Sequence, residues 1–309
     1  MGRAGPEAPS DGGVRGRGNL AIVKPRVLML LVFSGLTGFV LASTEADATW
    51  GMFLWLLAGG VLATASANIF NNILDRDRDS LMERTMWRPL PAGRMTPRQA
   101  GGLGATLGVL GLALLAVQLN VLTATLTLAG MLFYIIVYTM VLKPVTVENI
   151  TLGGVAGAFP PVVGWTAVTG QVDWPPVYLG ILVILWTPPH FWSLALFHKD
   201  DYRRAGVPML PVVRGEEETR RRIVVYSLGL VTASVLFLMW DQLSGLYLLG
   251  MVCLNIPMLI LVLSLYRRGT MADAWALFRY SNVYLVALFV LLMADITWPF
   301  LLDPPGLLD

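Results

Sequence analysis

The stretch between residues 71 and 91 combines acidic, basic and amide side chains directly after a long apolar run. Asn71, Asp75 and Asp79 recur there at intervals of four residues. If the preceding helix continues, each interval advances about 40° beyond a full turn, so the three side chains share one face, with the carboxylates about 6 Å apart along the axis. Mg²⁺ is commonly shared between one or two protein carboxylates and substrate phosphates. The spacing therefore predicts a site for a magnesium-bound diphosphate.

Arginines accompany this acidic face. Arg76, Arg84 and Arg88 can neutralise diphosphate oxygens that the metal does not reach, whereas Asp77 points away from the shared face. The alternative is a charged loop whose Asp and Arg side chains pair with one another in water. The interruption of the apolar helix by Asn68 favours the site, because polar residues at that depth usually face a cavity.

The composition identifies the elements that must position these residues. Hydrophobic residues make up 56% of the 309 residues and charged residues only 14%, against about a quarter charged in a soluble domain. We therefore predict an all-α, polytopic membrane domain over residues 21–309, preceded by a disordered tail over residues 1–20 that is rich in Gly, Pro and Arg. About nine transmembrane helices are expected near residues 27–44, 51–73, 99–118, 121–142, 150–169, 176–197, 223–241, 244–265 and 280–300.

The positive charges predict the orientation in the membrane. All 22 Lys and Arg residues fall in the N-terminal segment or in alternate loops, and loops such as 43–49 and 170–175 contain none. By the positive-inside rule, the N-terminus and the charged loops are cytoplasmic and residues 303–309 lie outside. We expect a bacterial inner membrane. The alternative is the mitochondrial inner membrane, but Glu7 and Asp11 argue against an amphipathic transit peptide in the Arg-containing tail.

Other general features narrow the class of protein. Cys253 is the single cysteine and lies in an apolar run, which excludes a disulfide framework and a cysteine-ligated metal. The net charge of +2 says little about partners, and no nucleic-acid partner is expected; the partner that the composition requires is the lipid bilayer.

Two apolar segments carry small residues and prolines. Gly153 to Gly164 has the small-residue spacing of closely packed membrane helices, and Pro160-Pro161 should kink it beside a cavity. Trp186 to Trp192 should be a second broken segment, with His190 directly after Pro188-Pro189. A histidine there either contacts a ligand or satisfies a carbonyl that the prolines free.

A second charged motif begins at His198, four helices after the first. It contains Lys199, Asp200 and Asp201, and Phe197 stands four residues before Asp201. Adjacent helical residues diverge by about 100°, so both acids cannot hold one metal equally well, and we favour Asp201. The equal offset of the two motifs suggests two halves that face each other across a central cavity.

The motifs together resemble those of the UbiA superfamily of membrane prenyltransferases. The first motif reads Asn71-x-x-x-Asp75-x-x-x-Asp79 and then Met82-x-Arg84-Thr85-x-x-Arg88-Pro89-Leu90. Its Arg-Thr and Arg-Pro-Leu details are similar to the protoheme IX farnesyltransferase (haem O synthase) branch, as are Lys24-Pro25-Arg26 and Tyr138-Thr139-x-x-Leu142-Lys143. The chain departs from that branch at Pro144, where the branch usually has Arg, so another residue must supply that charge.

The resemblance implies transfer of a farnesyl group from farnesyl diphosphate to a vinyl group of protoheme IX (haem b), giving haem O. Asp75 and Asp79 would hold Mg²⁺ with support from Asn71, and Asp201 would bring the opposing motif to a metal or cation. Arg76, Arg84, Arg88 and Lys199 would neutralise the diphosphate, and His190, Lys143 and Arg76 would contact haem or phosphate. Haem A synthase or a terminal oxidase would be the protein partner.

Three alternatives stand beside this interpretation. Broken helices and polar residues within the membrane are equally expected of a transporter, which leaves the clustered Arg and Asp residues unexplained. A prenyltransferase could act on a quinone or chlorophyll precursor instead. A CDP-alcohol phosphotransferase also uses Asp and Mg²⁺, but its Asp-Gly-x-x-Ala-Arg signature is absent from the sequence.

Overall fold

The computed structural model describes residues 18–302, and their side chains as far as residue 297. Residues 1–17 of the expected tail and the C-terminal residues 303–309 lie outside the described residues. The expected tail is too long at its other end, because Gly18 and Asn19 are helical and η1 (Leu20–Val23) follows at once. Ile22, which follows the expected tail, is only 3% exposed, and its burial stabilises the turn that begins at Leu20.

Between residues 18 and 302, nine helical segments are long and apolar enough to cross a membrane, which confirms the predicted count. The first four spans are α2 (Pro25–Ala42), α3 (Trp50–Asp79), α4 (Pro97–Gln118), and α5 (Val121–Leu132) with its continuations η2 (Phe133–Leu142) and α6 (Lys143–Val145). The fifth comprises α7 (Asn149–Gly153), η3 (Gly154–Ala158) and α8 (Phe159–Thr169), and the sixth is α9 (Trp174–Phe197). After the short α10 (Lys199–Arg204) and α11 (Leu210–Val213) come α12 (Gly215–Leu236) with η4 (Phe237–Met239), α13 (Gly245–Arg268) and α14 (Met271–Leu302).

Several helices extend beyond the predicted apolar runs. The end of α3 lies at Asp79 rather than near residue 73, and α12 and α14 begin at Gly215 and Met271. The predicted ends followed the loss of apolar side chains, but backbone hydrogen bonds continue a helix into polar surroundings. The extension of α3 is important for function, because it keeps the whole acidic motif helical.

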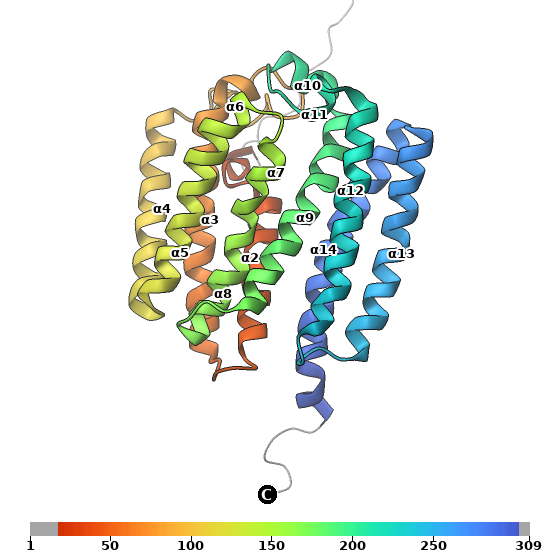
Figure 1. The fold of residues 1–309 in the computed structure, drawn as a ribbon. Coiled ribbons are helices and arrows are strands. Elements are labelled where there is room, and N and C mark those ends of the chain that lie inside the picture. Colours follow the sequence, from red (N-terminus) through yellow and green to blue (C-terminus); the bar gives the residue numbers. More distant parts are fainter. Residues whose placement is uncertain (1–17, 303–309) are drawn as a thin grey trace, which may run out of the picture.

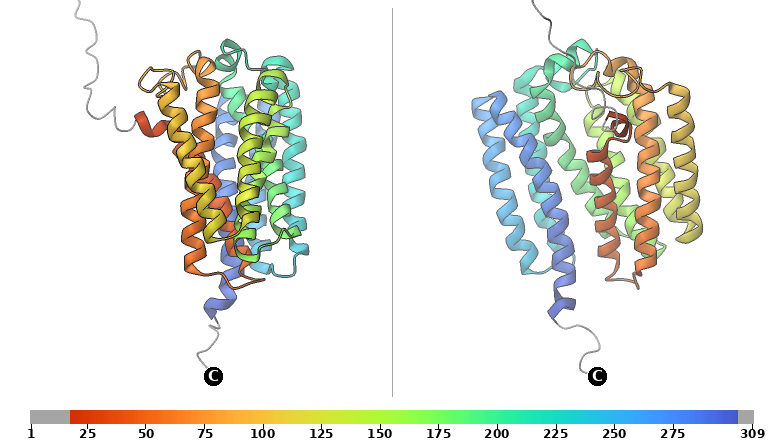
Figure 2. Two further views of the ribbon diagram at one scale, coloured as in Figure 1. Left: turned by 90° about the vertical axis from the view of Figure 1, so that its left-hand side faces the viewer. Right: turned by 180° about the vertical axis from the view of Figure 1, so that it is seen from behind.

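The helices alternate in direction and place both charged motifs at one end of the bundle (Figure 1). This end, here called the motif end, carries the loop over residues 80–96 together with α10 and α11, whereas the C-terminal end of α14 lies at the opposite end (Figure 1). From behind, α2 and α3 stand on one side of the bundle and α13 and α14 on the other (Figure 2). The sequential halves thus form two neighbouring groups of helices.

The backbones of α2 and α8 approach each other closely through glycine. A Cβ atom at Gly164 would lie 1.8 Å from the carbonyl oxygen of Gly35, and one at Gly38 would lie 2.0 Å from that of Pro161. Only residues without a Cβ fit this crossing. The predicted break in this span is present, but it precedes the prolines as the 3₁₀ segment η3. Pro160 and Pro161 lie in the first turn of α8, where their missing amide protons leave few bonds unmade.

The predicted break at Pro188-Pro189 is wrong, because α9 is one helix from Trp174 to Phe197. Proline keeps a φ angle compatible with a helix and removes only its own amide bond. Hydroxyl groups on either side add hydrogen bonds to the helix: Thr187 donates to the carbonyl of Val183 at 2.7 Å, and Ser193 donates to that of Pro189 at 2.7 Å. Such hydroxyls help to accommodate prolines in membrane helices.

Candidate active site

A cavity of about 520 Å³ extends from the motif end into the bundle and is lined by α2, α3, α5, η2, η3, α8, α9 and α14. This volume is typical of a cavity that encloses a small molecule. Asp75, Asp79, Arg84 and Arg88 line its polar part, and Leu56 on α3 lines its apolar part. One cavity therefore joins a charged region to a long apolar chamber.

The predicted helical face exists. Asn71, Asp75 and Asp79 are each 1% exposed and all line the cavity. Asp77, which was expected to point away, has a side chain that is 87% exposed and pairs with Arg76. The interval of four residues thus separates the acids of α3 into two that face the cavity and one that faces out.

Each buried carboxylate has a cationic neighbour. Lys143 Nζ lies 2.5 Å from Asp75 Oδ2, and Arg88 donates to Asp79 Oδ2 at 2.6 Å. Arg78 lies 3.8 Å from Asp75 Oδ1. Buried charges are retained where they are paired and hydrogen-bonded. Lys143, which was predicted from the sequence to bind a ligand, lines the cavity. Arg88 provides a guanidinium in the cavity, although Pro144 stands where the resembled branch usually has arginine.

Three residues that line the cavity carry a buried side-chain atom without a hydrogen-bond partner among residues 18–297, and one of these atoms is the hydroxyl oxygen of Ser34 on α2. The other two belong to charged side chains at the motif end. They are Asp75 Oδ1, an acceptor, and Arg84 Nε, a donor. A buried polar atom left unpaired is costly, so such atoms often mark the place of a ligand. The carboxylate oxygen suits a hard divalent cation and the guanidinium suits an anion. Among the described residues no group of three Asp, Glu, His or Cys side chains could hold a metal by itself. The two buried carboxylates that line the cavity, Asp75 and Asp79, are the kind of donor set that Mg²⁺ shares with a phosphate-bearing ligand.

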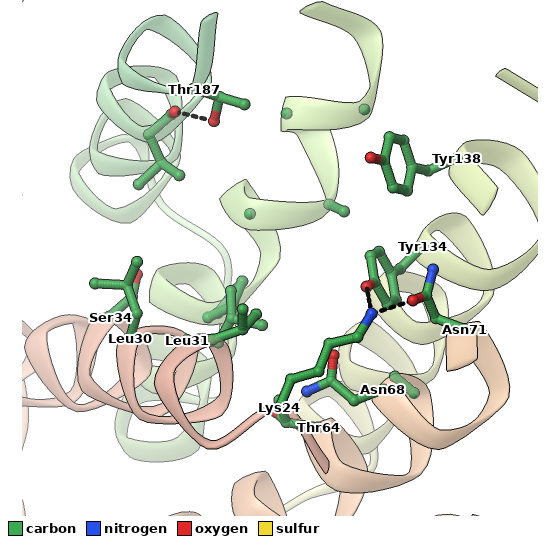
Figure 3. A pocket seen from close by; sticks show the side chains of 18 of the residues that line it. Lys24, Leu30, Leu31, Ser34, Thr64, Asn68, Asn71, Tyr134, Tyr138 and Thr187 are labelled. Atoms are coloured by element: carbon green, nitrogen blue, oxygen red, sulfur yellow. Dashed lines mark hydrogen bonds between the residues drawn. The ribbon is translucent and has the colours of Figure 1, made fainter. Parts of the chain in front are cut away.

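Lys24, which was named from the sequence only as part of Lys24-Pro25-Arg26 and was given no role there, also lines this cavity. It has φ 49° and ψ 68°, a left-handed conformation that is unfavourable for a residue with a Cβ. This conformation directs the side chain to Asn71 Oδ1 and, at 3.5 Å, to the hydroxyl of Tyr134 (Figure 3). Burial, assisted by the guanidinium of Arg88, lowers the pKa of Lys24 to about 7. An arriving anion would favour the charged amine.

The fourth span carries a ten-residue π-helical segment, η2, beside this face. Such segments are rare and often occur at functional sites. Asn71 Nδ2 donates to Thr139 Oγ1 at 2.8 Å, which joins η2 to α3. Tyr134 and Tyr138 line the cavity with stacked rings whose centroids are 5.7 Å apart. Nothing in the apolar sequence of residues 133–142 distinguishes a π-helix from an α-helix.

Three of the predicted residues, Arg76, Lys199 and Asp201, do not line the cavity. Arg76 is on the outer face of α3 and pairs with Asp77 at 3.0 Å. Lys199 pairs with Glu216 at 2.9 Å. Neither lines the cavity. The expectation for Arg76 overlooked that it follows Asp75 directly, which turns it about 100° away from the shared face.

Asp201 is buried, but it does not join Asp75 and Asp79 in one acidic group. Its carboxylate binds Arg204 and lies 3.6 Å from His198 Nδ1. Arg204 also donates to Glu83 of the first motif loop at 3.1 Å. Burial and the charge of Arg84 lower the pKa of His198, so Arg204 is the cation that holds Asp201. The two motifs thus contact each other through Arg204, at residues that do not line the cavity, and the expected position of Asp201 across the cavity is not found.

His190 lies on the same cavity, among aromatic residues of α9 and α14. Its ring stacks on Trp186 with centroids 4.3 Å apart and on Phe278 at 4.8 Å. Its Nδ1 atom lies 2.8 Å from the hydroxyl oxygen of Ser281. The cavity therefore has a charged wall on α3 and an aromatic wall with one imidazole on α9 and α14.

A family model described as the UbiA prenyltransferase family matches residues 31–295. The chain belongs to this family, and its class is that of an all-helical membrane prenyltransferase. It is 44% identical over 283 residues to protoheme IX farnesyltransferase of Symbiobacterium thermophilum, covering 91% of this chain and 94% of that protein. It is 42% identical over 276 residues to protoheme IX farnesyltransferase of Nitrosococcus oceani, covering 89% of this chain and 92% of that one.

Other relatives differ in length or share only the fold. Protoheme IX farnesyltransferase of Thermus thermophilus is 44% identical over 284 residues, and the chain spans only 46% of its length. A solved structure of digeranylgeranylglyceryl phosphate synthase matches with a TM-score of 0.74 and 18% identity over 91% of this chain and 98% of that one. A UbiA homologue from Archaeoglobus fulgidus bound to DMAPP and Mg²⁺ matches with a TM-score of 0.64 and 16% identity over 88% and 98%. These two likenesses show the fold.

Proposed function

We propose that this protein transfers a farnesyl group from farnesyl diphosphate to a vinyl group of protoheme IX, giving haem O. The observation that carries the proposal is a pair of buried atoms without a hydrogen-bond partner, Asp75 Oδ1 and Arg84 Nε, at the charged end of an apolar cavity. They suit a metal–diphosphate group whose hydrocarbon chain continues into the bundle. The relatives named protoheme IX farnesyltransferase support the choice of substrates.

Asp75 and Asp79 are the residues that would hold Mg²⁺, with Asn71 beside them. Both carboxylates are buried on the cavity face of α3, and the homologue from Archaeoglobus fulgidus that shares this fold is bound to Mg²⁺ and DMAPP. When bound, Mg²⁺ supplies positive charge to the diphosphate oxygens. Asp201 would act indirectly, because it holds Arg204 against the first motif loop.

The cations of the chain bind and orient the leaving group. Arg84, Arg88, Lys24 and Lys143 line the cavity around the acidic face. The bond between the farnesyl carbon and the diphosphate oxygen breaks with its electron pair on oxygen, so preorganised cations lower the barrier most where this charge develops. The rings of Tyr134 and Tyr138 lie beside the same region and can stabilise the allylic cation, each by about 1–2 kcal/mol when desolvated.

The aromatic wall would receive the porphyrin. Trp186, Phe191 and Phe278 line the cavity around His190, and a neutral imidazole is a natural axial ligand for haem iron. The vinyl carbon attacks the allylic cation and forms the new carbon–carbon bond. Water then adds to the carbon beside the ring and releases a proton, which gives the hydroxyethyl product.

The motif end would face the cytoplasm of a bacterial cell, as the positive-inside rule predicts. The loop over residues 80–96, which contains Arg84 and Arg88, and the helix α10 (Lys199–Arg204) both lie at this end (Figure 1). A cytoplasmic motif end would give soluble diphosphate direct access to the acidic face. A haem A synthase or a terminal oxidase would be the protein that receives the product.

The decisive experiment offers acceptors to the purified protein in detergent with labelled farnesyl diphosphate and Mg²⁺. Protoheme IX should acquire the label and a mass increase equal to one farnesyl group plus one hydroxyl group, with release of one diphosphate. Label on a quinone or chlorophyll precursor alone would assign the protein to another branch of the family. Chelation of Mg²⁺ should stop the transfer, because the acidic face then lacks the charge that neutralises the diphosphate. If the purified protein transferred the farnesyl group to none of the acceptors, this result would contradict the proposal.

A further inference from the structure

The cavity face of α3 continues below the acidic motif in a regular order of residue types. At steps of three or four residues from Asp75 toward the helix start, the residues that line the cavity are first polar, then small, and finally large. They are Asn71, Asn68, Ala67, Thr64, Ala63, Gly60 and Leu56. Thr64, Asn68 and Asn71 follow one another along this stretch of α3 (Figure 3). One helix face thus carries both the acids and the wall of the apolar chamber.

Gly60 marks open space in this wall. A Cβ atom added there would have no heavy atom within 4 Å, although the residue lines the cavity. The neighbouring Gly59 is different, because a Cβ atom there would lie 2.6 Å from Leu115. A larger side chain at position 60 would therefore fill cavity rather than displace protein.

Leu56, one turn further along α3, is the cavity-lining residue of this helix that lies furthest from Asp75. It is 4% exposed and packs in an apolar cluster with Phe39, Leu115 and Val163. Val163 and Leu36 line the cavity from α8 and α2 at this depth. The chamber therefore ends on large side chains that belong to the core, whereas its sides on α3 are small.

The depth of the chamber fits a chain of limited length. Gly60 lies about four helical turns, roughly 22 Å, from Asp75 along α3, and Leu56 lies about one turn deeper. An isoprene unit is about as long as one helical turn. A diphosphate at Asp75 followed by three isoprene units would therefore end near Gly60.

We propose that Gly60 and Leu56 set the length of the prenyl chain that the enzyme accepts, because they determine how far the chain can extend along α3 from the acidic motif. This inference rests on the proposed prenyl transfer. The space at Gly60 admits the third isoprene unit, and the side chain of Leu56 occupies the place where a fourth unit would end. Because the acids and the stop lie on one rigid helix, their separation is fixed by the helical rise.

The test is a competition between geranyl, farnesyl and geranylgeranyl diphosphate with protoheme as acceptor. Wild-type protein should prefer the farnesyl donor. In Gly60→Leu the ratio of kcat/KM for geranyl over farnesyl diphosphate should rise about tenfold or more, which corresponds to about 1.4 kcal/mol. Transfer from geranyl diphosphate itself should persist, because the diphosphate site is intact.

Two further variants complete the design. Gly102→Leu is the matched control, because Gly102 is an exposed glycine on α4 that also has open space and does not line the cavity; its donor preference should equal that of the wild type. Leu56→Ala should shift preference toward geranylgeranyl diphosphate. If wild-type protein transfers no prenyl group, the proposed function fails. If it does so, and both Gly60→Leu and a folded Leu56→Ala keep the wild-type preference, the chain-length inference alone is overturned.

Discussion

His190 donates a hydrogen bond from Nδ1 to the hydroxyl oxygen of Ser281. The direction follows from the proton of Ser281, because a hydroxyl has only one and Ser281 donates it to the carbonyl of Phe278 at 2.8 Å. The Nδ1 atom at 2.8 Å must then carry the proton of the neutral imidazole. Within residues 18–297 no protein group hydrogen-bonds Nε2, so the lone pair of the ring is free on a residue that lines the cavity.

This bond predicts a positioning role for Ser281. In Ser281→Ala the imidazole loses the partner that fixes its tautomer, so haem affinity should fall about 10- to 100-fold. Titration of the purified protein with haem b, followed at the Soret band, measures this. Ser281→Thr keeps the hydroxyl and should restore the wild-type spectrum, and His190→Ala should lose the histidine-ligated band while farnesyl diphosphate still binds. Identical spectra for all three variants and wild type would make His190 a packing residue.

The three acids of α3 provide a second, internally controlled prediction. Asp75→Asn and Asp79→Asn should each abolish prenyl transfer, because they remove a buried carboxylate from the cavity. Asp77→Asn should keep most of the activity, because that side chain is exposed. Turnover is measured in protein shown to be folded by its elution and thermal unfolding. Loss of activity at Asp77 equal to that at the other two acids would refute the role of the helical face.

The sequence was sufficient to predict the helices and the acidic face, for physical reasons. An apolar run of about 20 residues has few alternatives to a membrane span, and residues four apart on a helix share a face whatever surrounds them. The placement of Asp75 and Asp79 inward and Asp77 outward follows from this local geometry alone.

Residues whose position depends on other segments were harder to predict. Lys24 reaches the cavity through a left-handed backbone conformation that only the packed structure shows. Asp201 was predicted from its motif to act at a metal or a cation, and in the structure its carboxylate binds the guanidinium of Arg204. The prolines of α9 were predicted to break the helix, because the sequence does not show how the surrounding helix accommodates them. In each of these three cases, packing against distant segments of the chain, rather than local helix propensity, determines the observed conformation or contact.

Two arginines of one motif offer a third prediction with opposite outcomes. Arg88 lines the cavity and binds Asp79 at 2.6 Å, whereas Arg76 pairs with the exposed Asp77. Arg88→Ala should lower kcat/KM for farnesyl diphosphate about 100-fold, comparable to the loss of one strong electrostatic contact to a developing anion. Arg76→Ala should change it less than about threefold, as expected of an exposed ion pair. Steady-state kinetics with varied farnesyl diphosphate decide the matter, and an equal loss for both variants would contradict the assignment.

The last prediction concerns orientation in the membrane and uses single cysteines. Cys253 is exposed on α13, so it is first replaced by Ser to give a background without reactive thiols. Cysteines placed at Asp47 and at Val172, in two of the loops without Lys or Arg, should react with an impermeant maleimide added to intact cells. A cysteine at Trp87, exposed in the loop of the first motif, should react only after the cells are opened. Because the motif end carries the lysines and arginines of the loops, labelling of position 87 from outside would reverse the proposed topology and place the diphosphate site on the wrong side for a cytoplasmic supply of substrate.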